Sequence, residues 1–121
     1  MKISNDPIDA LLEVFSNLYN ECDRVSIWYS DSATIKYLSD NLSDEDSDKG
    51  VVLFPDDKGG KIVIYLNIEL PVNEIPVVLI HQLSHIIAGK NSGHSDVYCN
   101  VYSVLAENYL SYLKKKDELI E

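Results

Sequence analysis

The sequence predicts an α+β fold in which a small antiparallel or mixed sheet, expected to be mainly antiparallel, packs on an N-terminal helix, a histidine-bearing helix and a long C-terminal helix. Apolar residues recur at helical spacing in three segments, and short stretches rich in β-forming residues lie between the first two. The chain has 121 residues, of which 45% are hydrophobic. This length and composition suit one domain, residues 1–121, with a sizeable core.

The first helix is expected over residues 7–21. Asp6 is a suitable N-cap, and Pro7 suits the first helical position. Apolar side chains then recur at helical spacing: Ile8, Leu11, Leu12, Phe15, Leu18 and Tyr19. Residues 24–30 are rich in β-forming residues and predict a strand. In residues 31–38 the apolar side chains follow neither the helical nor the strand periodicity.

A β-hairpin is expected over residues 51–68. Its arms are the apolar runs 51–54 and 61–68, joined by a turn that contains Gly59 and Gly60. The acidic stretch before it, residues 39–49, has alternate aspartates, but Lys49 lies where a calcium loop requires glycine. We therefore interpret that stretch as a solvated loop.

Two helices are expected after the hairpin. Asn73 is predicted to cap the first helix, Pro76 falls in its first turn, and Gly89 ends it. The last helix is expected to begin near Ser95 and to continue past Leu113. Residues at helical spacing mark its buried face: Tyr98, Val101, Tyr102, Leu105, Tyr109 and Tyr112.

Charge and composition exclude several classes of partner. The chain carries 20 acidic and 10 basic residues, a net charge of −10, which would repel a phosphate backbone, so no nucleic-acid partner is expected. No apolar run is long enough to span a membrane, and the N-terminus lacks the features of a secretory signal, so we expect a cytoplasmic protein. Cys22 and Cys99 form no disulfide framework, and Cys99 is expected to be a buried thiol. The oligomeric state is not indicated.

The three histidines of the chain, His81, His85 and His94, lie within 14 residues. Histidines four apart on a helix project from one face, so the first two rings can converge on one ion. The helix stop at Gly89 and the short loop after it can return His94 as a third ligand. Three protein ligands leave a fourth position for water, which is typical of a catalytic Zn²⁺ site.

The run HQLSH at residues 81–85 resembles the zincin signature His-Glu-x-x-His, with glutamine as its second residue. The run GHSDVY at residues 93–98 is similar to the Gly-His-Gly/Ser-x-x-Phe/Tyr segment of SprT-like and WLM peptidases. The resemblance covers roughly residues 50–112. It implies a zincin-like minimal metallopeptidase domain that hydrolyses peptide or protein substrates, with His94 as the third zinc ligand and Tyr98 packing the following helix.

Gln82 departs from this pattern. The family has a glutamate there that accepts a proton from the metal-bound water, and glutamine cannot take that proton. Removal of a general base typically costs about 10²–10⁴ in rate, so this form is expected to be inactive or strongly impaired. Either a glutamate has been replaced in an otherwise intact peptidase, which we favour, or the glutamine is native to a pseudo-peptidase that binds peptides or proteins.

Other residues are weaker candidates. Glu107, on the last helix, is an alternative third ligand, because a carboxylate can bind zinc. Asp96 could orient His94 as an outer-sphere partner or favour the helix N-terminus, and Tyr98 is a second outer-sphere candidate. Zincins hold substrate as an added strand at a sheet edge, which suggests substrate binding along the second hairpin arm at Ile64, Tyr65 and Leu66.

Overall fold

The computed structural model describes residues 7–19, 25–42, 48–55, 60–89 and 96–120. This part of the chain forms an α+β fold, as predicted. Its helices and strands follow in the order α1 (Pro7–Leu18), β1 (Val25–Ser30), α2 (Ser32–Leu42), β2 (Gly50–Leu53), β3 (Ile62–Asn67), α3 (Ile75–Ala88) and α4 (Asp96–Ile120).

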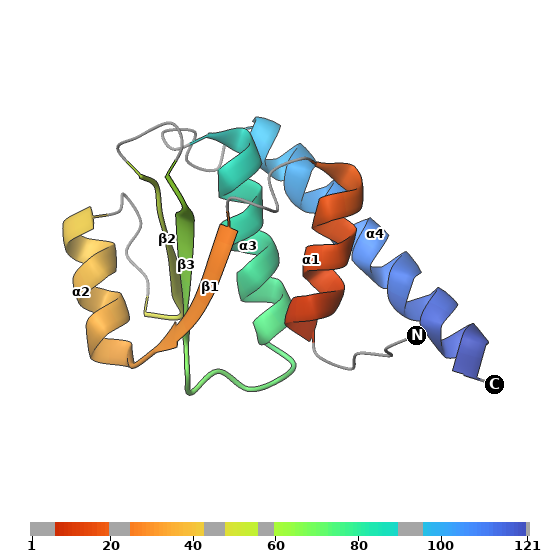
Figure 1. Cartoon of the computed structure of the whole chain (residues 1–121), viewed down its shortest axis with the longest axis horizontal. Coiled ribbons are helices and arrows are strands. Elements are labelled where there is room, and N and C mark those ends of the chain that lie inside the picture. The colour runs from red at the N-terminus through yellow and green to blue at the C-terminus, as the bar shows by residue number, and fades with distance from the viewer. Residues whose placement is uncertain (1–6, 20–24, 43–47, 56–59, 90–95, 121) are drawn as a thin grey trace.

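The elements are arranged in layers around α3 (Figure 1). Helix α2 covers one face of the sheet, α3 covers the other, and α1 and α4 pack on α3. The N-terminal helix was expected to back the sheet, but it packs mainly against α3 and α4. Because α3 has neighbours on several sides, its buried residues include polar ones: Gln82, Ser84 and His85, beside Leu79 and Leu83.

The sheet is mixed, which is one of the two expected forms, but it is not mainly antiparallel. Its strand order is β1-β3-β2, and β1 runs parallel to β3 from Val25↔Ile62 to Ser30↔Asn67. The shorter β2–β3 ladder is antiparallel, which confirms the predicted hairpin. Parallel strands need a long crossover connection, and here it contains α2, which the sequence periodicity did not indicate.

Helix α2 occupies residues 32–42, which include most of the segment whose apolar residues followed neither the helical nor the strand periodicity. Its start is capped by Asp31, whose Oδ1 accepts the backbone N–H of Thr34 at 2.7 Å. That hydrogen bond, together with one from the Thr34 side chain, lowers the pKa of Asp31. Ile35 and Ser39 are fully buried, whereas most of the helix is exposed. Residues 39–42 of the predicted solvated loop therefore belong to α2, and residues 43–47 of that stretch lie outside the described part.

The limits of the other helices differ from the predictions in detail. Helix α1 ends at Leu18, and its predicted cap lies outside the described residues. Helix α3 has Glu74 rather than Asn73 at its N-cap, without a side-chain capping bond, and Pro76 falls in its first turn as predicted. Gly89 ends α3 with φ of 108°, and its N–H donates to the His85 carbonyl at 2.9 Å.

Helix α4 buries the predicted face. Tyr98, Val101, Leu105 and Tyr109 are buried, and Tyr102 and Tyr112 are partly buried. Cys99 is exposed, so the prediction of a buried thiol is wrong. Cys99 follows the buried Tyr98 by one residue, which turns its side chain about 100° around the helix axis and away from the buried face.

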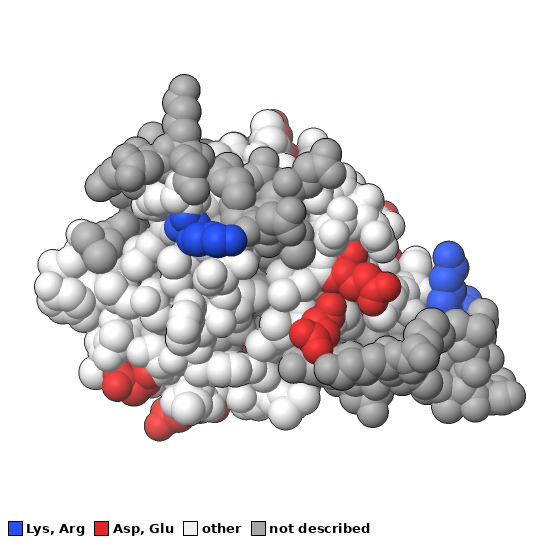
Figure 2. Space-filling view, in the orientation of Figure 1, with Lys and Arg blue, Asp and Glu red and all other residues white. Residues whose placement is uncertain are grey.

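The exposed surface is largely acidic or uncharged on the face drawn in Figure 2. Acidic side chains gather over α1, and few basic side chains are visible. Among the described residues, no helix is both long enough and apolar enough to cross a membrane.

Two residues, Gly50 and Asn67, fix how β2 and the residues before it lie against their neighbours. A Cβ at Gly50 would lie 2.8 Å from Val78 Cγ1, so only glycine lets α3 approach β2 this closely. Asn67, at the end of β3, is 7% exposed and donates both to Ser32 Oγ and to the Asp48 carbonyl, each at 2.7 Å. These contacts hold the start of β2 beside the first turns of α3.

Candidate metal centre and the adjoining pocket

His81 and His85 lie one turn apart on the same face of α3, as their spacing predicts. Their Nε2 atoms are 3.3 Å apart, and their ring centroids are 4.9 Å apart. His85 is 6% exposed, and His81 is partly buried. Two nitrogen ligands at about 2.0–2.1 Å from a tetrahedral zinc are about 3.3–3.4 Å apart. The separation of the two Nε2 atoms therefore fits one shared zinc ion.

Tyr98, in the first turn of α4, closes the other side of this pair. Its hydroxyl oxygen lies 2.8 Å from His81 Nδ1, the nitrogen that does not face His85. Its ring lies 4.6 Å from the His85 ring and 5.5 Å from the His81 ring, measured between centroids. The α3–α4 packing thus brings the predicted outer-sphere tyrosine into direct contact with both imidazoles.

The third ligand is not placed by the described residues. His94 lies outside them. Glu107 is exposed on α4, and no group of three or more His, Cys, Asp or Glu residues among the described residues could hold a metal ion. Glu107 therefore does not join the histidine pair in such a group. Asp96 is exposed in the first turn of α4, where a carboxylate favours the helix N-terminus.

Gln82 follows His81 on α3 and is almost completely buried. It is 2% exposed, and its Oε1 has no hydrogen-bond partner within the described part of the chain. A buried polar atom left without a partner typically costs about 1–3 kcal/mol. Such atoms are rare in folded proteins, and they mark positions that serve a function or carry strain. Position 82 is therefore unusual on structural grounds as well as by its place in the motif.

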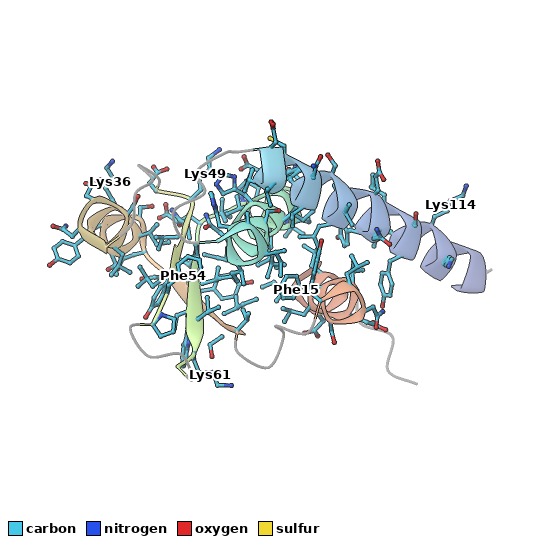
Figure 3. All side chains as sticks on the ribbon, turned by 90° about the horizontal axis from the view of Figure 1, so that it is seen from above. Phe15, Lys36, Lys49, Phe54, Lys61 and Lys114 are labelled. Carbon is cyan, nitrogen blue, oxygen red and sulfur yellow. The ribbon has the colours of Figure 1, made fainter. Side chains whose placement is uncertain are left out.

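A pocket of about 300 Å³ opens beside the histidine pair. Its lining combines two valines and four polar or charged residues: Lys49, Glu74, Val77, Val78, His81 and Gln82. Lys49 Nζ lies 3.5 Å from Glu74 Oε1, and both side chains are substantially exposed. Figure 3 shows Lys49 between α2 and the start of α4.

Sequence reasoning missed Lys49 and Glu74 as site residues. The two are far apart in the sequence and belong to no motif. They meet only because Gly50 allows the start of β2 to lie against α3. The glycine next to Lys49 was the only local signal of that close approach.

The structure contradicts the prediction that substrate binds as an added strand along Ile64, Tyr65 and Leu66. Ile64, Tyr65 and Leu66 belong to β3, the central strand, which pairs with β1 on one side and β2 on the other. A strand paired on both sides cannot accept an added peptide strand. Ile64 and Leu66 are also fully buried in the core, so these residues serve packing rather than substrate binding. The error arises because β1 pairs with the edge of β3 that was expected to be open.

Comparisons with known proteins assign no family to the chain. No family model matches it, and no curated protein or solved structure shows significant similarity to it. Its function is therefore inferred from its own residues, above all from His81, His85, Tyr98 and Gln82.

Proposed function

We propose that the chain is a zincin-type metallopeptidase domain that binds zinc through His81, His85 and His94, and that Gln82 leaves it inactive or strongly impaired. The 3.3 Å separation of the two Nε2 atoms on α3 is the observation that best supports this proposal. Zinc bound there would supply a polarised carbonyl and a water of lowered pKa for peptide hydrolysis. All three protein ligands in this proposal are histidines.

The residue at position 82 would determine whether that water can be deprotonated. Gln82 lies directly after the first histidine and lines the pocket beside it. An amide can orient a water molecule by hydrogen bonding, but it cannot accept a proton at neutral pH. A glutamate at the same position would act as the general base, a role typically worth about 10²–10⁴ in rate.

The pocket beside the pair would receive part of a peptide or protein substrate. Its volume of about 300 Å³ lies at the lower end of the range for small-molecule sites. That size suits a single side chain of a peptide rather than a large cofactor. The net charge of −10 continues to argue against nucleic acid as the partner.

A Gln82→Glu variant tests the proposal. We expect it to hydrolyse an unfolded protein substrate at least about 100-fold faster than the unchanged chain, because it regains a general base. A Gln82→Leu variant is the matched control, since it has similar size and no proton acceptor, and it should stay inactive. Removal of zinc by a chelator should abolish the activity of Gln82→Glu, and added zinc should restore it.

A second candidate is a peptide-binding module in which Gln82 is native. The burial of this side chain, which is 2% exposed, favours a neutral amide over a carboxylate, because burying an unpaired charge costs more than burying an amide. A Gln82→Glu variant that binds zinc and peptides but does not hydrolyse them would establish this candidate and contradict the peptidase proposal.

A further inference from the structure

The hydroxyl of Tyr98 contacts the nitrogen of His81 that faces away from His85. Tyr98 Oη lies 2.8 Å from His81 Nδ1, whereas His81 Nε2 lies 3.3 Å from His85 Nε2. Tyr98 is 6% exposed, and its ring contacts both imidazoles. Packing therefore holds the hydroxyl on the side of His81 opposite to the candidate zinc position.

We infer that Tyr98 is a positioning residue for His81: its oxygen accepts the Nδ1–H of the imidazole and leaves the Nε2 lone pair directed toward the zinc position. This inference rests on the proposed function. A neutral imidazole carries its proton on one nitrogen, and the hydrogen bond at that nitrogen decides which tautomer is present. A histidine that binds zinc through Nε2 carries its proton on Nδ1, where Tyr98 Oη, at 2.8 Å, can accept it.

The inference extends to the metal-free chain, in which His85 Nε2–H would donate to His81 Nε2 and His81 Nδ1–H would donate to Tyr98. The same two contacts also fit the reverse direction, and the tautomer measurement described below distinguishes the two. With its proton on Nδ1, His81 would present a lone pair toward the site before any zinc arrives. Fixing a ligand in advance in this way lowers the cost of assembling the site.

A Tyr98→Phe variant removes the acceptor and keeps the ring. Its zinc affinity should fall about 10–100-fold, the usual effect of removing the hydrogen-bond partner of a ligating histidine. Tyr102→Phe is the matched control: it lies one turn along α4, its ring centroid is 6.2 Å from that of Tyr98, and its hydroxyl has no hydrogen-bond partner among the described residues. Competition with a chromophoric chelator, on the full chain, measures both affinities.

Nitrogen-15 NMR of the histidine side chains tests the tautomer without zinc. In chelator-treated unchanged protein, His81 should carry its proton on Nδ1. In Tyr98→Phe the ring should show a mixture of both tautomers, because the acceptor is gone. The Tyr102→Phe spectrum should match that of the unchanged protein.

Several results would overturn the inference. One is a zinc affinity of Tyr98→Phe equal to that of the unchanged chain, and another is an equal loss in both variants, which would indicate a packing role alone. A third is a His81 proton found on Nε2 in the metal-free protein. Failure of the unchanged chain to bind zinc would instead contradict the proposed function, and the tautomer of metal-free His81 would then decide on the role of Tyr98 separately.

Discussion

At the scale of single residues, position 82 governs how the histidine pair is interpreted. The pair alone supports zinc binding, whereas hydrolysis needs a proton acceptor beside the bound water. Gln82 is buried next to His81 with its Oε1 unpaired among the described residues, so it occupies the right place with the wrong chemistry for a base. This is why the Gln82→Glu variant separates a peptidase from a binding module.

A second residue contact gives a prediction about pH. The hydroxyl of Tyr112 donates to Glu13 Oε2 at 2.7 Å, and this hydrogen bond, more than burial or the charge of Glu13, raises the pKa of Tyr112. The folded pKa of the phenol therefore exceeds its unfolded value. The stability that this contact contributes is fully present below the unfolded pKa, about 10, and is lost as pH rises through the higher folded pKa.

Glu13→Gln should bring the tyrosinate titration of Tyr112 back toward its ordinary range. The measurement is the difference in ultraviolet absorbance titration between each protein and its Tyr112→Phe counterpart. The contact is exposed, so the variant should lose less than about 1 kcal/mol of unfolding free energy at neutral pH. An unchanged Tyr112 titration in Glu13→Gln would show that this hydrogen bond does not form in solution.

Part of the candidate site could be predicted at this scale. The i,i+4 spacing of His81 and His85 sufficed to place both rings on one face of α3. The contact between Tyr98 and His81 could not be predicted, because it depends on how α3 and α4 pack. Lys49 and Glu74 were missed for the same reason, since tertiary contacts bring them to the pocket.

At the scale of elements, the site depends on how closely α3 approaches the sheet. Gly50 in β2 faces Val78 in α3, and a Cβ there would lie 2.8 Å from Val78 Cγ1 and 3.3 Å from the Tyr65 carbonyl oxygen. Val78 also lines the pocket. The position of α3 is therefore linked to the shape of the pocket.

Gly50→Ala should destabilise the fold by about 1–3 kcal/mol, the usual cost of overpacking a core. Urea unfolding measures the loss. Because the nearer clash is with a side chain, the double variant Gly50→Ala/Val78→Ala should be more stable than the sum of the two single variants predicts. Strictly additive losses would show that Gly50 and Val78 do not press on each other.

The elements themselves were predicted unevenly. Helices α1, α3 and α4 have long apolar periodicities and clear stop signals, so their existence and approximate limits followed from the sequence. Helix α2 is short and mostly exposed, and its Asp31 cap was the signal that was overlooked. Missing it removed the crossover that makes β1 parallel to β3, so the sheet was expected to be mainly antiparallel and the edge that β1 occupies was expected to be open.

At the scale of the whole molecule, the layered arrangement explains why a helix with histidine, glutamine and serine is buried. The sheet covers one side of α3, and α1 and α4 cover others (Figure 1). Enclosed polar groups are satisfied by partners, and His81 and His85 contact each other while His81 also contacts Tyr98. The fold thus places the two histidines where they are largely shielded from bulk water, and His81 lines the adjoining pocket.

Zinc content tests the central claim most directly. The purified chain, loaded with zinc and passed through a desalting column, should retain about one zinc ion per chain. His81→Ala, His85→Ala and His94→Ala should each lose most of it, whereas Glu107→Ala should retain it. A chain that retains no zinc, or a His94→Ala variant that binds zinc as well as the unchanged protein, would contradict the account.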